Sequence, residues 1–212
     1  MRAFIYVGGS IAPENITEHP KSGDLTIAAD SGLHNAKKLG ERIDIVLGDL
    51  DSVGDFTLPD GAEQLTFPPE KDLTDAQLAV EAAIVRGADD IIIVGGLDGR
   101  LDHTLSLMGI LVDMNGRGVH AIALSGNNRI RYIKSTSTLL PRSGYKYLSL
   151  IAADQKVKGV SVEGCKYPLN NATLWRREQF AVSNEISGNC AFVSVNKGGL
   201  YIIESYDDRF EK

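Results

Sequence analysis

The sequence predicts an α/β domain over residues 1–127, followed by an antiparallel β domain over residues 128–212. In the first half, short apolar runs that stop at Gly or Asp alternate with helical patterns. This alternation is typical of a doubly wound, mainly parallel sheet with helices on both faces. After about residue 127, strand patterns follow one another with Gly, Pro and Asn turns between them, and no amphipathic helix intervenes.

The elements of the first half follow from apolar spacing. Buried parallel strands are expected at residues 4–7, 25–29, 43–47, 91–94 and 119–124. Two helical patterns lie between the later strands. They consist of Leu78, Ala82 and Val85, which stop at Gly87, and of Leu101, Leu105, Met108 and Val112, which stop near Gly116.

The second half contains strand patterns only. These lie at residues 130–133, 147–152, 157–162, 191–195 and 200–203. Because turns rather than helices connect them, we expect antiparallel pairing.

Composition limits the classes of protein to which the chain can belong. Hydrophobic residues make up 43 % of the 212 residues and charged residues 24 %, which argues against disorder. The formal net charge is −6 and no basic cluster is longer than residues 175–177, so nucleic-acid binding is disfavoured.

Redox and targeting features predict a cytoplasmic protein with no membrane contact. Cys165 and Cys190 form no CxxC pair and have no matched histidines, so a zinc site or a disulfide framework is disfavoured. The N-terminal apolar run is too short for a signal peptide. No stretch approaches the ~20 apolar residues of a membrane span.

The strongest local signal is a pair of carboxylates after the third expected strand. Asp49 and Asp51 are two residues apart, so in an extended chain they point to one side and can converge at the ligand-binding edge of the sheet. Two carboxylates held together repel each other unless a cation lies between them, and Mg²⁺ prefers such hard oxygen ligands. A solvated turn is the alternative interpretation.

Asp30 and a segment before the first helical pattern add to this signal. Asp30 closes the second expected strand and would emerge at the same edge. Thr74 and Gln77 form a capping box, which places Asp75 in the first helical turn. Helix capping alone would explain Asp75, whereas Lys71 beside this turn is suited to a phosphate.

The segment 95–103 combines glycines with charged residues. Gly95 and Gly96 would let backbone N–H groups approach an anion closely. Arg100 offers a planar fork of donors that suits a phosphate. Asp102 begins the next helix, where capping is an alternative role, and His103 is suited equally to a phosphate contact or to structure.

Several common sites are absent from the sequence. It contains no GxxxxGK[ST], no GxGxxG after the first strand, no HExxH and no GxSxG. These absences argue against a P-loop kinase, a dinucleotide site, a zinc protease and an α/β-hydrolase.

At these residues the sequence resembles the thiamine pyrophosphokinase family. The shared motifs are Gly48-Asp49-Leu50-Asp51-Ser52, Lys71-Asp72-x-Thr74-Asp75, Gly95-Gly96-x-x-Gly99-Arg100-x-Asp102-His103 and the acidic loop Asp30-Ser31-Gly32. Residues 164–169 and 182–185 resemble the two thiamine-side segments of the family, so the likeness covers nearly the whole chain.

The resemblance implies an ATP-binding α/β domain, a thiamine-binding β-sandwich and a homodimer with active sites at the subunit boundary. The implied reaction moves the terminal pyrophosphoryl group of ATP to the hydroxyl of thiamine and releases AMP. Asp49, Asp51 and Asp75, with Asp30 as a fourth, would hold one or two Mg²⁺ ions.

The resemblance also implies a set of nucleotide and substrate contacts. Those on the ATP side are Asp30, Ser31, Lys71, Asp72, Thr74, Gln77, Gly95, Gly96, Arg100, Asp102 and His103. Ser183, Asn184 and Tyr201 would contact thiamine. Residue chemistry alone favours a turn for the first two and core packing for Tyr201, so their assignment rests on the resemblance. Asp51 or Asp75 would orient or deprotonate the hydroxyl, and the sequence does not separate a base from a metal ligand.

Two other functions remain open at this point. One is a pyrophosphokinase of the same architecture that acts on a hydroxymethyl pterin, which would require different β-domain segments. The other is a non-catalytic nucleotide sensor, which would keep Arg100 and the glycines but would not need so many carboxylates.

Overall fold

A computed structural model describes residues 1–48, 58–66 and 73–206 of the chain. The chain divides into two compact units, Met1–Gly126 and Asn127–Lys212. We refer to them as the α/β unit and the β unit and describe each separately.

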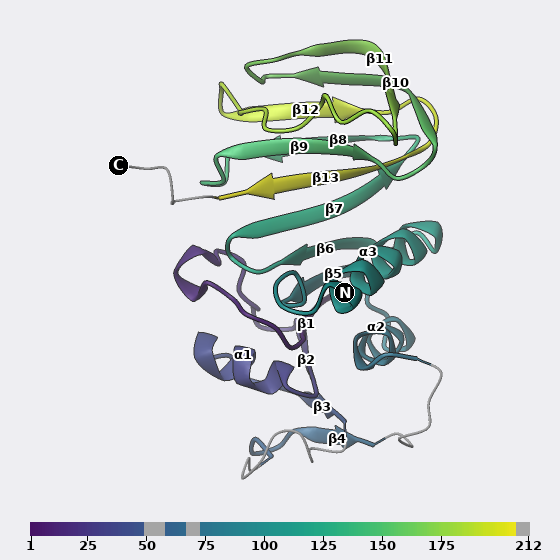
Figure 1. The fold of residues 1–212 in the computed structure, drawn as a ribbon. Coiled ribbons are helices and arrows are strands. Elements are labelled where there is room, and N and C mark those ends of the chain that lie inside the picture. Colours follow the sequence, from purple (N-terminus) through teal and green to yellow (C-terminus); the bar gives the residue numbers. More distant parts are fainter. Residues whose placement is uncertain (49–57, 67–72, 207–212) are drawn as a thin grey trace. The chain divides into compact units, whose positions relative to one another are not determined.

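The α/β unit is built on parallel strands in the order β4-β3-β2-β1-β5-β6 (Figure 1). Their bounds are β1 Arg2–Tyr6, β2 Leu25–Ala29, β3 Ile45–Leu47, β4 Glu63–Leu65, β5 Asp90–Val94 and β6 His120–Leu124. The strand order reverses between β1 and β5, and such a switch point is where open α/β sheets bind ligands. All five expected strands are confirmed to within two residues at each end. The short β4, with only polar residues before Leu65, was missed.

Helices cover both faces of this sheet. In Figure 1, α1 (Gly32–Leu39) lies on one side, whereas α2 (Asp75–Val85) and α3 (Leu101–Gly116) lie on the other. On the α1 face, Leu33 packs in a buried cluster that includes Phe4 and Tyr6 of β1. A 3₁₀ turn, Pro13–Asn15, lies between β1 and β2. The predicted doubly wound architecture is confirmed.

The predicted apolar stripes of α2 and α3 do not face the core. Val85 is 82 % exposed, and Leu101 and Leu105 are 69 % and 58 % exposed. The buried face of α3 instead comprises Leu107, Ile110, Leu111 and Met114. Because α3 carries apolar residues around most of its circumference, spacing located the helix but could not select the side that packs.

The described strands of the β unit all pair antiparallel. One group has the order β7-β13-β9, and the four-stranded sheet has the order β11-β10-β12-β8. The bounds are β7 Asn128–Lys134, β8 Ser137–Pro141, β9 Tyr147–Ala152, β10 Lys156–Glu163, β11 Leu169–Trp175, β12 Cys190–Ser194 and β13 Gly199–Ser205. The predicted antiparallel β domain is confirmed, but β8 and β11 were missed, because β8 has only two consecutive apolar residues and β11 begins Leu-Asn-Asn.

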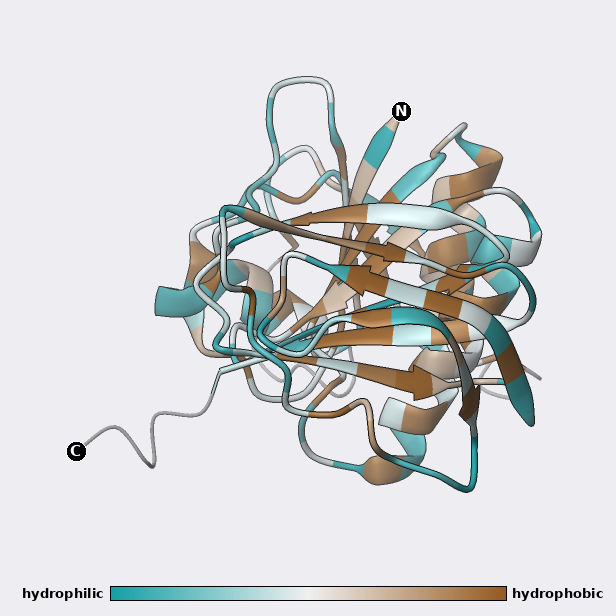
Figure 2. Ribbon diagram, turned by 90° about the horizontal axis from the view of Figure 1, so that it is seen from above, coloured by the Kyte–Doolittle hydropathy of each residue, from teal (hydrophilic) through white to brown (hydrophobic). Residues whose placement is uncertain are grey.

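The core of the β unit lies between its two groups of strands. Leu148 and Leu150 of β9 and Ile202 of β13 belong to one buried cluster with Val157 and Val193 of the other group. Hydrophobic and hydrophilic residues alternate along several of these strands (Figure 2), as expected where one face of a sheet packs inward.

A network of charged side chains is also buried in the β unit. The Glu204 side chain is 3 % exposed and lies 3.6 Å from Arg129 and 3.0 Å from Arg131, measured from carboxylate oxygen to guanidinium nitrogen. The Ser143 hydroxyl donates to the other carboxylate oxygen at 3.0 Å and accepts from Arg129 at 3.0 Å. The network joins β13 to β7 and to the loop after β8.

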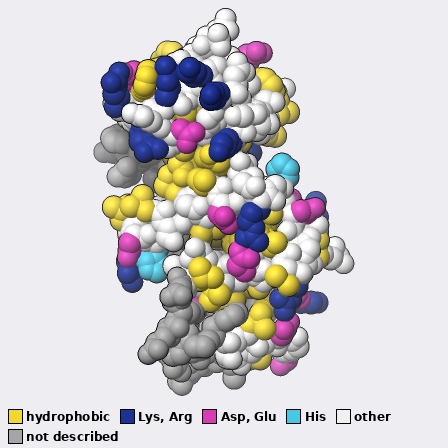
Figure 3. Space-filling model, turned by 90° about the vertical axis from the view of Figure 1, so that its right-hand side faces the viewer, with side chains coloured by type: hydrophobic (Ala, Val, Ile, Leu, Met, Phe, Trp, Pro, Cys, Tyr) yellow, Lys and Arg dark blue, Asp and Glu magenta, His cyan; other side chains and the backbone are white. Residues whose placement is uncertain are grey.

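Lys and Arg side chains gather on the part of the β unit that faces the viewer in Figure 3. Lys156 and Arg177 lie over the Trp175 ring, with 4.3 Å and 4.9 Å from cation to ring centroid. In the sequence, only the short run 175–177 indicated a basic cluster. Lys156 is far from this run in the sequence, but it lies beside Trp175 because β10 pairs with β11.

Within the described ranges, no helix is both long enough and apolar enough to cross a membrane.

Candidate functional site

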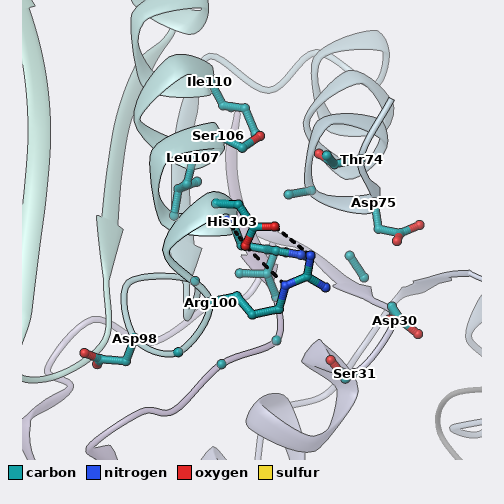
Figure 4. Close-up of a pocket in the computed structure, with 18 residues that line it drawn as sticks. Asp30, Ser31, Thr74, Asp75, Asp98, Arg100, His103, Ser106, Leu107 and Ile110 are labelled. Carbon is teal, nitrogen blue, oxygen red and sulfur yellow. Dashed lines mark hydrogen bonds and ion pairs between the residues drawn. The ribbon is translucent and has the colours of Figure 1, made fainter. Parts of the chain in front are cut away.

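A cavity of about 630 Å³ opens at the carboxyl ends of the parallel strands in the α/β unit. It lies at the switch point of the sheet, as expected for a ligand site. Figure 4 shows its lining side chains. They come from five segments: Val7–Gly9, Ala29–Ser31, Thr74–Ala76, Gly96 with Asp98–Arg100, and the α3 residues Asp102, His103, Ser106, Leu107 and Ile110.

Asp30 lies directly after β2 in an unusual backbone conformation. Its φ is +49°, a left-handed value that costs a non-glycine residue energy and that often occurs at functional sites. Its N–H donates to Leu47 O at 2.8 Å, which fixes the turn beside the end of β3. A Cβ atom added to Gly48 would lie 3.5 Å from Asp30 Cα, so the residue preceding Asp49 lies beside Asp30.

Asp49 and Asp51 lie outside the described residues, as do Lys71 and Asp72. Their assignment as metal and phosphate contacts therefore stays a prediction. Among the residues that the structure does describe, no three His, Cys, Asp or Glu side chains are close enough together to hold a metal ion.

The start of α2 confirms the predicted capping box. The Thr74 hydroxyl accepts from Gln77 N–H at 3.3 Å, and Gln77 Oε1 accepts from Thr74 N–H at 3.0 Å. Asp75 follows in the first helical turn, on the cavity wall, with its carboxylate on the same side of the site as Asp30 in Figure 4. Gln77 does not line the cavity, and its side chain serves the cap.

Arg100 and Asp102 form an ion pair at the mouth of the cavity. Arg100 Nη2 donates to Asp102 Oδ2 at 2.6 Å, and Arg100 Nε donates to Oδ1 at 3.2 Å (Figure 4). The hydrogen bond from Arg100 lowers the pKa of Asp102, and a backbone hydrogen bond from His103 adds to the effect. Both side chains are largely exposed, at 74 % and 63 %, and exposed pairs of this kind are weak. A phosphate could therefore replace Asp102 as the partner of Arg100 at little cost.

One face of α3 forms a side of the cavity, and the sequence identified only its first residue, His103. His103, Ser106, Leu107 and Ile110 follow one another at helical spacing and all line the cavity. The 3.6-residue period that predicted the helix could also have identified Ser106, Leu107 and Ile110, if the stripe that begins at His103 had been preferred to the one that begins at Leu101.

The predicted role of the Gly95 and Gly96 amides is not supported. Gly95 N–H donates to Leu124 O at 2.9 Å, and Gly96 N–H donates to Gly8 O at 2.8 Å. Both N–H groups are thus used within the sheet edge, and only Gly96 lines the cavity. The sequence could not show this, because the acceptors come from distant segments.

Ser183 and Asn184 lie on a loop of the β unit that pairs with β9. Ser183 has a φ of +57°, and its N–H donates to the Ser149 hydroxyl at 3.0 Å. Asn184 Oδ1 accepts from Tyr167 N–H at 3.0 Å, and Asn184 Nδ2 donates to Tyr167 O at 2.7 Å. The Asn184 side chain therefore holds the backbone of Tyr167.

The same loop lines a second, smaller cavity of about 80 Å³ in the β unit. Tyr167, Phe180, Val182 and Asn184 all contribute to its wall. Tyr167 and Phe180 are 60 % and 56 % exposed, so aromatic surface is open to a ligand or partner here.

Tyr201 lies apart from this loop. It pairs with Ile151 on β9, whereas Asn184 pairs with Leu148, three residues away and so at roughly 10 Å along the strand. The Tyr201 ring lies 5.4 Å from that of Tyr132, centroid to centroid, and burial raises the pKa of its phenol. Within the β unit, these contacts match the core-packing interpretation of Tyr201 better than a shared site with Asn184.

The fold and the cavity together define a doubly wound α/β ligand-binding protein joined to an antiparallel β unit. Comparison with known families specifies this class. The family "Thiamin pyrophosphokinase, catalytic domain" matches residues 17–123, half of the chain, and "Thiamin pyrophosphokinase, vitamin B1 binding domain" matches residues 136–200. The chain therefore belongs to the thiamin pyrophosphokinase family.

Two relatives agree with this assignment over most of the chain. A thiamine pyrophosphokinase from Bacillus subtilis is 27 % identical over 210 residues, covering 96 % of this chain and 98 % of the relative. Thiamin pyrophosphokinase 1 from Caenorhabditis elegans is 25 % identical over 200 residues, covering 90 % of this chain and 82 % of the relative.

Solved structures show the same fold. The crystal structure of thiamine pyrophosphokinase from Bacillus subtilis matches with a TM-score of 0.85 at 24 % identity, over 98 % of this chain and 100 % of that one. Thiamin pyrophosphokinase from Candida albicans matches with a TM-score of 0.74 at 15 % identity, over 97 % and 90 % of the two chains.

Proposed function

We propose that the chain transfers the pyrophosphoryl group of ATP to the hydroxyl of thiamine, giving thiamine diphosphate and AMP. The observation that carries this proposal is that one chain contains both the catalytic and the vitamin B1 binding regions of the family. The cavity at the switch point of the α/β unit gives the catalytic region a ligand site.

The cavity suits a nucleotide because its two parts differ in polarity. Leu107 and Ile110 on α3 provide an apolar wall against which a base can pack. Asp30, Asp75 and Arg100 also line the cavity, and phosphates with their counter-ions would lie beside these charged side chains. This division favours a ligand with a flat apolar end and an anionic end.

Carboxylates from separate elements fit a role in holding Mg²⁺. Asp30 after β2 and Asp75 on α2 line one cavity, and Gly48, which precedes Asp49, lies beside Asp30. Asp49, Asp51, Asp75 and Asp30 would hold the metal, which when bound neutralises phosphate charge. Arg100 would stabilise the phosphate oxygens as their charge redistributes, and Asp51 or Asp75 would orient the thiamine hydroxyl.

The two alternatives from the sequence are less well supported. A hydroxymethyl pterin substrate does not agree with the vitamin B1 binding region over residues 136–200. A nucleotide sensor would not require the vitamin B1 binding region either, because its ligand site would lie in the α/β unit alone.

The direct test is an assay of purified protein with ATP, thiamine and Mg²⁺, monitored for AMP and thiamine diphosphate. We expect both products in equal amounts, and none when thiamine or Mg²⁺ is omitted. Turnover of a hydroxymethyl pterin instead of thiamine would support the first alternative, and nucleotide binding without any turnover would support the second.

Replacement of Arg100 by lysine should reduce kcat/KM by about 10²–10³-fold, the usual effect of losing one preorganised donor. Lysine keeps the charge but loses the two-pronged donor geometry that fits a phosphate. Arg117→Lys is the matched control, because Arg117 pairs with Glu81 on α2 and does not line the cavity. Equal activity of the Arg100→Lys and Arg117→Lys proteins would contradict a phosphate role for Arg100.

We further propose a cytoplasmic homodimer in which the β unit of one subunit completes the site of the other. The exposed Leu101 and Leu105 on α3 and the exposed Tyr167 and Phe180 in the β unit provide apolar surface for such an assembly. Most homodimers are two-fold symmetric, so a shared site would occur twice.

Mixed dimers test this arrangement. Asp51→Asn and Asn184→Ala proteins, each first measured to be inactive alone, are mixed in equal amounts and allowed to exchange subunits. About half of the dimers should be mixed and should contain one site free of both changes, which restores about a quarter of wild-type activity. No recovery despite confirmed exchange would mean that each site lies within one subunit.

A further inference from the structure

A buried asparagine donates hydrogen bonds to the backbone that follows β1. Asn35 of α1 is 2 % exposed. Its Nδ2 donates to Val7 O at 2.7 Å and to Gly9 O at 3.0 Å. One side chain thus holds two carbonyl groups of the turn 7–9, which lines the cavity of the α/β unit.

The carbonyl group of Gly8, which lies between those of Val7 and Gly9, is hydrogen-bonded to another segment. Gly8 O accepts from Gly96 N–H at 2.8 Å. A Cβ atom added to Gly95 would lie 2.5 Å from Val7 O, 2.9 Å from Gly8 O and 3.1 Å from Asn35 Nδ2. Three consecutive carbonyl oxygens are therefore turned toward Asn35 and the Gly95–Gly96 segment.

This arrangement determines where the N–H groups of the turn point. Every described peptide bond is trans, and in a trans peptide the C=O and N–H groups point in opposite directions. The N–H groups of Gly8, Gly9 and Ser10 therefore point away from Asn35 and Gly96. No acceptor for the N–H groups of Gly8 and Gly9 occurs among the described residues. Successive N–H groups on one side of a turn form a concave anion site.

We propose that the turn Gly8–Gly9–Ser10 binds a phosphate of the nucleotide, and that Asn35 is the positioning residue that orients it. The proposal rests on the proposed function for the identity of the anion. It assigns to this turn the role that Gly95 and Gly96 cannot fill, because their N–H groups are already bonded. The turn follows β1 at the switch point of the sheet and precedes the family-matched region 17–123.

The first experiment replaces Asn35 by aspartate, which has the same size but cannot donate when ionised. Two carbonyl groups would then face a carboxylate, and the turn would have to reorient. Binding of ADP and of adenosine is measured by calorimetry. We expect about tenfold or greater weakening for ADP, since charge-assisted hydrogen bonds are lost, and no more than about twofold for adenosine.

Thr26→Val is the matched control. Thr26 is a buried polar residue of β2 whose hydroxyl donates to Asp44 at 2.8 Å, and it does not line the cavity. This change also removes a buried hydrogen bond from the α/β unit, but it should leave the affinity for ADP and for adenosine unchanged. Equal weakening of ADP and adenosine by Asn35→Asp, or no weakening of either, would overturn the proposal.

The second experiment uses the unaltered protein, so it does not depend on the folding of a variant. Amide resonances are followed by NMR as inorganic pyrophosphate is added. The Gly8 and Gly9 amide protons should shift more than those of Gly95 and Gly96. The reverse order, or no shift at Gly8 and Gly9 at saturation, would overturn the inference. Failure of the wild-type chain to bind ADP, adenosine or ATP would instead refute the proposed function.

Discussion

An Asp51→Asn protein should fold normally and lose several orders of magnitude in kcat/KM. The amide removes one of two carboxylates that the sequence places together after β3, and a site for Mg²⁺ depends on such hard, charged ligands. The measurement is AMP production at saturating ATP and Mg²⁺, with thermal unfolding to compare the folded state of the two proteins.

Asp60→Asn provides the matched control for this change. Asp60 is an exposed aspartate of the same connecting region that does not line the cavity, so its amide variant should retain wild-type activity. Near-normal turnover of a well-folded Asp51→Asn protein would remove Asp51 from the metal site. Loss of activity in both variants would mean that activity depends on any aspartate in this segment, and the result would then not support a metal role for Asp51.

Glu204→Gln should lower the free energy of unfolding of the β unit by about 3–5 kcal/mol, the usual cost of removing one partner from a buried ion pair. Glu204 contacts both Arg129 and Arg131, and its side chain is 3 % exposed. Glutamine has nearly the same shape, so the change removes the negative charge while leaving the packing intact. Urea unfolding followed by far-UV circular dichroism measures the loss.

Glu185→Gln is the corresponding surface control. Glu185 lies 3.4 Å from Lys166, and both side chains are about half exposed. Exposed pairs contribute about 0–1 kcal/mol, so this variant should unfold close to the wild-type midpoint. A Glu204→Gln protein as stable as the Glu185→Gln protein would show that the buried network does not stabilise the unit.

The fold was predictable because apolar runs and turn residues repeat with clear periods. All ten predicted strands and both helical patterns correspond to elements of the structure. Elements with a short or interrupted pattern were missed. The helix α1, Gly32–Leu39, contains two consecutive lysines and a central Asn, and β11 begins Leu-Asn-Asn, so neither shows a clean apolar period.

The candidate site was predictable only where chemistry and position coincide in the sequence. Asp30, Asp75 and Arg100 were identified because each follows a strand or begins a helix, and the structure brings all three to one cavity. Whether they contact a nucleotide stays a prediction. The role of Asn35 could not be read from the sequence, since its partners lie more than twenty residues away and are backbone atoms.

The order of the strands in the β unit has a consequence for synthesis on the ribosome. β13, the last strand made, lies between β7 and β9, which are made much earlier. Until β13 emerges, β7 and β9 have no strand between them and their edges stay open, a condition that favours aggregation of nascent chains. The α/β unit has all its strands by residue 124 and can form its sheet while the rest is still being translated. Premature termination before β13 should therefore leave a folded first unit attached to an unfinished, protease-sensitive second one.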